Sequence, residues 1–341
     1  FSKAIELNPK NANIYISRAY VYQNKGDSER AISDFSKAIE LNPKNANIYI
    51  GRANVYQNKG RYEQAISDFS KAIELDSKNA NIYISRAHAY QNKGNSERAI
   101  SDFSKAIELD PKNANIYISR AYVYQNKRDS EQAISDFSKA IELDSKNANI
   151  YISRANTYQE QGRYSQARLD YLRAIELDAN NANAYFGRAN SYRNEGRYDQ
   201  AISDFSKAIE LNPKNANIYI SRAYVYQNKG DSERAISDFS KAIELDVNNA
   251  NAYFGRGNAN VNKGNNDQAI LDLSKAADLS NNNTNIYLSR ANVYYQKKEY
   301  DKAKADLSKV EELGGKLNLG LREELDKVSG KKRVNVYPAQ N

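Results

Sequence analysis

The feature that most constrains the fold is a period of 34 residues that runs through almost the whole chain. The stretch from Ala12 to Asn45, ANIYISRAYVYQNKGDSERAISDFSKAIELNPKN, recurs with variation down the sequence. Nine copies carry a tyrosine at the same place: Tyr15, Tyr49, Tyr83, Tyr117, Tyr151, Tyr185, Tyr219, Tyr253 and Tyr287. Self-similarity at a fixed period of this length is typical of structural units that stack into a solenoid. The sequence therefore predicts a repeat solenoid.

Each copy has the pattern of two helices. Apolar residues of the first copy follow helical spacing in two sets, before and after Gly26: Tyr15, Ala19 and Tyr22, then Ala31, Phe35, Ala38 and Leu41. An asparagine such as Asn11 precedes every first helix, where its side chain can cap the backbone. Gly26 suits the left-handed conformation that ends a helix, and Pro43 stops the second helix. One helix pair cannot bury both apolar faces, so stacking on neighbours must complete the core.

These positions resemble the signature of the tetratricopeptide repeat, at matching offsets over about nine tenths of the chain. The resemblance implies an all-α fold, a right-handed superhelical solenoid of stacked antiparallel helix pairs. It rests on the residues Tyr15, Ala19, Tyr22, Gly26, Ala31, Phe35, Ala38 and Pro43 and their counterparts. The first signature position carries tyrosine where the family often has tryptophan. The position where leucine is common carries arginine in every repeat.

The period also sets the domain organisation. Residues 1–11 match the second half of a repeat, and residues 12–317 hold nine full repeats that we expect to form one elongated domain. After Gly314 and Gly315 the period fails, and residues 318–329 are predicted to form a capping helix that covers the last apolar face. Residues 330–341 are predicted to be an extended tail. Phe1 falls inside a second helix and is not methionine, so we expect the chain to be a fragment or a processed form.

Composition excludes several classes of function. The net charge of +8 is spread over the repeats with interleaved signs, whereas nucleic-acid binders concentrate Lys and Arg on one stripe. No apolar run reaches the ~18 to 20 residues of a membrane-spanning helix. The chain has no cysteine, and its lone histidine, His88, stands where other repeats carry Tyr or Asn. We therefore predict no catalytic site, no metal site and no cofactor. The compartment stays unknown, although the absence of cysteine permits an extracytoplasmic site.

A polar pair recurs in all nine repeats. Each arginine at the seventh repeat position is followed sixteen residues later by an aspartate, for example Arg18–Asp34, Arg52–Asp68, Arg120–Asp136 and Arg222–Asp238. Sixteen residues across a helical hairpin can bring the two side chains together. One interpretation is an ion pair that fixes the register of the two helices. The other is a row of arginines that binds acidic ligands.

The resemblance implies that a ligand lies on the concave face, which the first helix of each repeat lines. Carried onto this chain, the predicted peptide-binding residues are Asn13, Ile16, Tyr20, Gln23, Asn47, Asn54, Gln57, Asn81, Asn115, Tyr122, Asn149, Asn156, Asn183, Phe186, Asn190, Asn217, Tyr224, Asn251, Phe254 and Asn258. Amides can donate to and accept from a peptide backbone at once. The asparagines could equally serve solubility and capping. The lysine that chaperone-binding members need is replaced by Ile16, Ile50 and Ile84, so chaperone tails are not expected ligands.

The predicted function is a non-enzymatic protein–protein interaction scaffold that binds an extended peptide or a partner's surface. The competing class is structural, a solenoid that associates with itself end to end into a filament. The expected partners are thus a protein or peptide, or a second copy of the chain, and neither nucleic acid nor a membrane.

Overall fold

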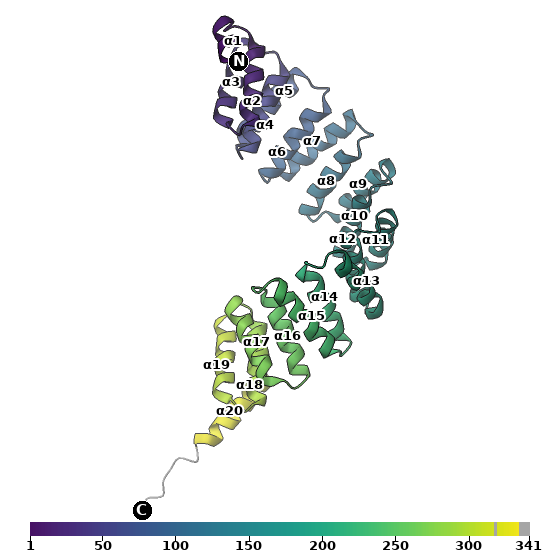
Figure 1. Ribbon diagram of the computed structural model, residues 1–341, viewed down its shortest axis with the longest axis vertical. Helices are drawn as coiled ribbons and strands as arrows, with labels where there is room; N and C mark the ends of the chain where they lie inside the picture. Colours follow the sequence, from purple (N-terminus) through teal and green to yellow (C-terminus); the bar gives the residue numbers. More distant parts are fainter. Residues whose placement is uncertain (317–318, 334–341) are drawn as a thin grey trace, which may run out of the picture. The chain divides into compact units, whose positions relative to one another are not determined.

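The computed structural model describes residues 1–316 and 319–333, which form helices joined by short turns, with no strand among them. The chain divides into two compact units, Phe1–Leu177 and Asp178–Asn341, where the sequence suggested one elongated domain. Figure 1 shows the first unit in purple to dark teal and the second in dark teal to yellow. Within each unit a helix contacts only its near neighbours in the chain, as expected for stacked repeats.

The first unit begins with α1 (Ser2–Leu7), which is followed by five helix pairs. The first helices of these repeats, each of 13 residues, are α2 (Ala12–Asn24), α4 (Ala46–Asn58), α6 (Ala80–Asn92), α8 (Ala114–Asn126) and α10 (Ala148–Glu160). The second helices, each of 14 residues, are α3 (Ser28–Leu41), α5 (Tyr62–Leu75), α7 (Ser96–Leu109), α9 (Ser130–Leu143) and α11 (Tyr164–Leu177).

The second unit holds four helix pairs and a final helix. Its first helices are α12 (Ala182–Asn194), α14 (Ala216–Asn228), α16 (Ala250–Asn262) and α18 (Thr284–Gln296). Its second helices are α13 (Tyr198–Leu211), α15 (Ser232–Leu245), α17 (Asn266–Leu279) and α19 (Tyr300–Glu312).

The final helix, α20 (Leu319–Arg333), covers the end of the second unit. Its buried side chains Leu321 and Leu325 pack against Ala291, Ala303 and Leu307 of the last repeat. The helix continues past residue 329, so the extended tail does not begin at residue 330 as the sequence suggested. Leu317 and residues 334–341, on which parts of the cap and tail predictions depend, lie outside the described residues.

The core of each of the first seven repeats is built around one almost fully buried aromatic ring and several alanines. Phe35 is fully buried between Ala19, Ala31 and Ala38, because small residues let the two helices approach closely. In seven repeats the tyrosine that replaces tryptophan is also buried, and its hydroxyl bonds to the turn before its own helix. Tyr15, for example, donates to the carbonyl of Pro9 at 3.3 Å. Tyrosine at this position therefore fills the core and ties down the preceding turn.

The turn between the two helices of a repeat needs a left-handed residue. Gly26 has φ +77°, a conformation that costs glycine nothing because it has no Cβ. Arg128 and Lys298 take the same place in two other repeats with φ of 61° and 62°. These two repeats keep the turn geometry even though they lack glycine.

Capping asparagines start the first helices, and a neighbouring asparagine offers a matched control. Asn79 accepts a hydrogen bond from the backbone N–H of Asn81 at 3.1 Å, whereas the exposed side chain of Asn81 bonds to nothing in the described chain. We expect Asn79→Ala to lower the free energy of unfolding by about 1 kcal/mol, because the N–H loses its partner. Asn81→Ala should leave it unchanged. Urea unfolding followed by circular dichroism measures both, and equal effects would contradict the assignment.

Candidate functional site

One side of each first helix carries the residues that the sequence predicted for ligand binding. In α2 these are Asn13, Ile16, Tyr20 and Gln23, spaced by three or four residues, so they share one stripe of the helix. We call this stripe and its counterparts in the other repeats the first-helix face. A ligand laid across the stacked first helices would meet the same stripe in each repeat.

Nine asparagines stand at the first position of this stripe. All are exposed, and none of their side-chain amides hydrogen-bonds to another part of the described chain. They are Asn13, Asn47, Asn81, Asn115, Asn149, Asn183, Asn217, Asn251 and Asn285. The asparagine two residues earlier caps the helix instead. Its side chain accepts a hydrogen bond from the backbone N–H of the exposed asparagine or, in α12 and α16, from the N–H of the residue that follows it. These nine amides are thus free to donate and accept hydrogen bonds.

Aromatic rings stand in the middle of the stripe in several repeats. Tyr20 and Tyr122 are each 43% exposed, and each sets its ring at a steep angle against a core phenylalanine. The centroid of Tyr20 is 5.2 Å from that of Phe35. His88 makes the same contact with Phe103 at 5.1 Å. The histidine therefore substitutes for tyrosine as a ring that covers the core.

Some predicted ligand-binding residues tie neighbouring repeats together. The Tyr122 hydroxyl lies 2.7 Å from the Ser153 hydroxyl, and Gln125 donates to Thr157 at 2.6 Å. Gln227 donates to the carbonyl of Gly255 at 3.1 Å. Gln23 and Gln57 stand at the same repeat position as Gln125 and are half-buried. Gln125 and Gln227 therefore contribute to repeat stacking, whereas the buried Oε1 atoms of Gln23 and Gln57 have no hydrogen-bond partner in the described chain.

The remaining predicted residues differ in accessibility. Asn156 is exposed, while Asn54, Phe186, Tyr224, Phe254 and Asn258 are half-buried. Asn190 is buried, and its amide donates to the carbonyl of Phe186 within the same helix at 3.1 Å. An amide that is buried and bonded to its own helix cannot meet a ligand, so the structure removes Asn190 from the predicted site.

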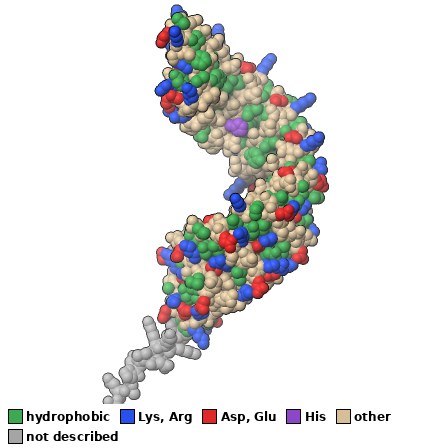
Figure 2. Space-filling view, in the orientation of Figure 1, with side chains coloured by type: hydrophobic (Ala, Val, Ile, Leu, Met, Phe, Trp, Pro, Cys, Tyr) green, Lys and Arg blue, Asp and Glu red, His purple; other side chains and the backbone are tan. Residues whose placement is uncertain are grey.

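The first-helix face carries almost no charge. Across all nine repeats, the positions of Asn13, Ile16, Ser17, Tyr20, Gln23 and Asn24 hold only two charged residues, Glu160 and Arg193. Figure 2 shows tan and green surface around the single histidine, drawn purple, while blue and red gather toward the opposite edge of the first unit. The charges of the chain are therefore found mainly on other surfaces of the repeats.

The arginine and aspartate of each repeat lie together and join its two helices. Arg120 donates to both carboxylate oxygens of Asp136, through Nε at 2.8 Å and Nη2 at 2.7 Å. The same fork joins Arg18 to Asp34, Arg52 to Asp68 and Arg222 to Asp238. Asp136 is buried, and Arg120 is 18% exposed at its side chain. Such bidentate pairs have more fixed geometry than a lysine contact would give.

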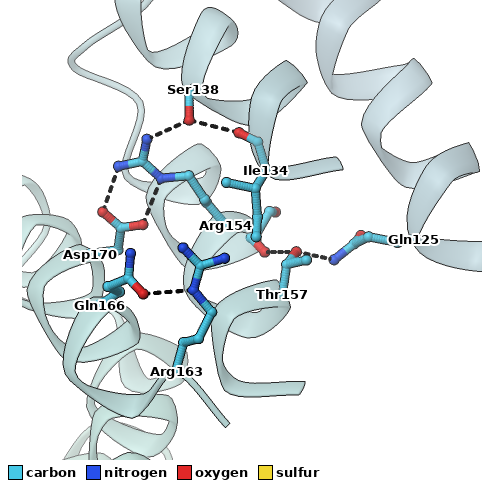
Figure 3. Close-up of polar contacts among 9 residues, drawn as sticks. Gln125, Ile134, Ser138, Arg154, Thr157, Arg163, Gln166 and Asp170 are labelled. Atoms are coloured by element: carbon cyan, nitrogen blue, oxygen red, sulfur yellow. Dashed lines mark hydrogen bonds and ion pairs between the residues drawn. The ribbon is translucent and has the colours of Figure 1, made fainter. Parts of the chain in front are cut away.

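The third contact of the arginine reaches the preceding repeat. Arg154 donates through Nη1 to the Ser138 hydroxyl at 2.8 Å, and Ser138 donates to the carbonyl of Ile134 (Figure 3). The other pairs of this kind are Arg18–Ser2, Arg52–Ser36, Arg86–Ser70, Arg120–Ser104, Arg222–Ser206, Arg256–Ser240 and Arg290–Ser274. All three guanidinium nitrogens of such an arginine therefore donate to residues of the chain itself, Nε and Nη2 to the aspartate and Nη1 to the serine. This favours the structural ion pair over a row of arginines that bind acidic ligands.

The electrostatics of the pair agree with this geometry. The hydrogen bonds that Arg120 donates to the Asp136 carboxylate raise the pKa of Arg120 above its usual value, and burial opposes that rise. An arginine is already protonated at every pH at which the protein folds. The pair therefore stays charged and provides no pH switch through its arginine.

Two sets of residues were not predicted from the sequence. The serines stand sixteen residues before eight of the nine paired arginines, the exception being Leu172 before Arg188, a regularity almost as visible as that of the aspartates. Tyr171 replaces the core phenylalanine in the fifth repeat, and its hydroxyl lies 2.5 Å from Asn156 Oδ1 and 3.1 Å from Gln159 Oε1. Burial raises the pKa of Tyr171. The change from Phe to Tyr in this one repeat was visible in the sequence and indicated a buried hydroxyl that needs a hydrogen-bond partner. Only the fold shows that Asn156 and Gln159 are the partners.

The eighth repeat departs most from the others. Gly255 and Gly257 leave no room for a side chain, since a Cβ on Gly255 would lie 2.3 Å from the Phe239 ring. Asn260, which replaces a tyrosine, is buried and donates to Asp272 at 3.3 Å. The glycines thus allow close packing of α16, although glycine inside a helix also lowers the helix propensity.

The fold is a helical-repeat solenoid of the class that serves as protein–protein interaction scaffolds. Four models of the tetratricopeptide repeat match the chain continuously between residues 12 and 313, and the chain belongs to this family. The matched segments are 12–45, 80–113 and 182–215; 58–94, 129–162, 155–194, 228–264 and 257–298; 35–67, 103–135 and 205–237; and 284–313. No curated protein matches the chain.

Solved structures share the fold. A tetratricopeptide repeat protein from Parabacteroides merdae is 23% identical, with 73% of this chain and 98% of that chain covered and a TM-score of 0.53. The C-terminal part of a repeat protein from Cytophaga hutchinsonii is 20% identical, covers 70% and 98%, and has a TM-score of 0.62. Yeast Tom70 is 18% identical, covers 99% and 92%, and has a TM-score of 0.51. At these identities the likeness establishes the fold alone.

Within residues 1–316 and the described part of α20, no three His, Asp or Glu side chains come together in a way that could hold a metal ion. In the same residues no helix has the length and hydropathy needed to cross a membrane.

Proposed function

We propose that this scaffold binds an extended peptide along the first-helix face. The observation that supports the proposal is the row of exposed asparagines without intramolecular partners, one in every repeat. An extended peptide leaves its N–H and C=O groups unpaired, and each carboxamide can donate to one and accept from the other. A repeated contact of this kind recognises the backbone and therefore tolerates different side chains.

The charge of the face limits the ligand. The face carries almost no charge, so an ionised ligand side chain would lose water without gaining a partner. The preferred peptide is therefore uncharged over the bound segment. The paired arginines, held by Asp and Ser, support the stack and do not take part in binding.

A labelling experiment tests the location. The chain has no cysteine, so Asn81→Cys and Ser101→Cys each provide one site for an environment-sensitive fluorophore. Asn81 lies on the first-helix face, and Ser101 is an exposed residue on the second helix of the same repeat. Titration with an uncharged synthetic peptide of Ser, Thr, Asn and Phe should change the fluorescence at position 81 and not at position 101. A change confined to position 101 would place the ligand elsewhere.

The contribution of the amides is tested by a triple variant. Replacing Asn47, Asn81 and Asn115 with alanine should weaken binding of the same peptide at least about tenfold, because each lost hydrogen bond is worth ~0.5 to 1.5 kcal/mol. Fluorescence anisotropy of the labelled peptide measures the Kd. The unfolding midpoint should not change, since these amides make no contact in the folded chain. Unchanged affinity would contradict the proposal.

A further inference from the structure

The middle position of the first-helix face has a period of its own. Reading from the first repeat to the ninth, it carries Tyr20, Asn54, His88, Tyr122, Asn156, Asn190, Tyr224, Asn258 and Asn292. A tyrosine thus occurs at every third repeat. The three helices that carry the tyrosines, α2, α8 and α14, have the identical sequence ANIYISRAYVYQN. The first-helix face therefore has two periods: its asparagines recur in every repeat, and its tyrosines recur in every third repeat.

The first unit contains two of these tyrosines with similar exposure and similar ring contacts, although only the Tyr122 hydroxyl is bonded to the next repeat, through Ser153. Tyr20 and Tyr122 are equally exposed, at 43%, and each ring leans on the core phenylalanine of its repeat, with centroid distances of 5.2 and 5.4 Å. A half-buried isoleucine lies one helical turn before each of them, Ile16 and Ile118. Each tyrosine and isoleucine form an apolar contact point on an otherwise amide-rich surface.

Between the two contact points the surface is more polar. The second repeat has Asn54 at the middle position, and the third has His88, whose ring is half-buried against Phe103. The two exposed tyrosines are consequently the largest apolar groups that the first-helix face of this unit offers to a ligand. Their separation is three repeats.

We propose that the first unit recognises an uncharged extended peptide by two apolar side chains, one on Tyr20 with Ile16 and the other on Tyr122 with Ile118. The proposal rests on the proposed function and adds a spacing rule to it. The asparagines bind the backbone between the two contacts, and the tyrosines set the register of the peptide.

The spacing follows from helix packing. Packed helices lie about 8 to 10 Å apart, so three steps from one first helix to the next span roughly 25 to 30 Å. An extended chain covers ~3.3 Å per residue. The two apolar side chains of the peptide should therefore be about eight or nine residues apart.

Two peptides and one variant test the rule. Both peptides consist of Ser, Asn and Thr with two phenylalanines, about eight residues apart in one and about four in the other; both spacings are even, so both side chains of an extended peptide lie on one face. The wild-type protein should bind the widely spaced peptide roughly fivefold more tightly, because only this peptide reaches both tyrosines. Tyr122→Asn should abolish the preference. Asparagine already occupies this position in Asn54 and Asn156, so the substitution is one that the fold accepts.

A second variant moves the contact point. In Asn54→Tyr combined with Tyr122→Asn, the two tyrosines stand one repeat apart, a distance of about 10 Å or three residues of extended peptide. The preference should then change to the closely spaced peptide, as measured by fluorescence anisotropy. A wild-type protein that binds both peptides equally, or a preference that survives in Tyr122→Asn, would overturn the spacing rule. Binding without a spacing preference would still agree with the proposed function, whereas the absence of binding to the face would refute both.

Discussion

Replacing Arg120 with alanine should lower the free energy of unfolding by about 3 kcal/mol. The substitution leaves the buried Asp136 carboxylate without the two hydrogen bonds that the guanidinium donates, and removing one partner of a buried pair typically costs ~3 to 5 kcal/mol. We expect the lower end of this range of destabilisation because the arginine side chain is itself partly exposed. Urea unfolding and native-state hydrogen exchange of α8 and α9 measure the effect.

A double-mutant cycle separates the pair from its surroundings. Adding Asp136→Ala to Arg120→Ala should recover part of the loss, because no unpaired charge then remains buried. The exposed pair Lys105–Glu108 is a control, since its members face water and their loss should barely change stability. Strict additivity of the two alanine substitutions would mean that Arg120 and Asp136 do not interact.

Replacing Phe103 with alanine should have a similar or larger effect, about 4 kcal/mol. The ring is fully buried in the core of the third repeat and supports the ring of His88. Phenylalanine-to-alanine changes in cores cost ~3 to 5 kcal/mol, because the lost burial is joined by an unfilled cavity. Since solenoid repeats depend on their neighbours, hydrogen exchange should also rise in the second and fourth repeats.

The chain supplies a matched control for this change. Leu273 and Leu307 stand where other repeats carry phenylalanine, and both are buried. Phe103→Leu should therefore cost less than about 1.5 kcal/mol, as expected for a change between large hydrophobic side chains. If leucine and alanine destabilised the protein equally, the loss could not be ascribed to the cavity.

The fold could be predicted almost completely because the 34-residue period and the helical spacing of Phe35, Ala38 and their counterparts agree in every copy. The all-α solenoid and the family are confirmed. The period could also place Arg120 opposite Asp136, since a helical hairpin of fixed length brings together residues sixteen apart. Ser104 was missed because it belongs to the preceding repeat, and the contact between repeats depends on how the pairs stack.

The accessibility of single site residues could not be predicted from repeat position alone. Asn190 occupies the same position as the exposed Asn156, but it turns toward the carbonyl of Phe186 and is buried. Asn156 meets Tyr171, a partner that only the fifth repeat provides. The side-chain rotamer and the substitutions in neighbouring positions decide whether such an asparagine is exposed. A pattern averaged over the repeats carries no information about either. End-to-end association likewise stays a prediction from the sequence.

The serine contact of the arginine affects how such an array can change its length. Within each unit, the second helix of a repeat carries the serine that contacts the following repeat. The following repeat carries the arginine that bonds to this serine, together with the aspartate that pairs with the arginine. Repeats joined in this way are interchangeable parts, because inserting or removing one leaves a junction of the same composition. Residues 1–41 and 205–245 are identical, as copying of whole units would produce. Copy number, and with it the length of the peptide that we propose the array binds, can therefore change in one genetic event without the evolution of a new interface.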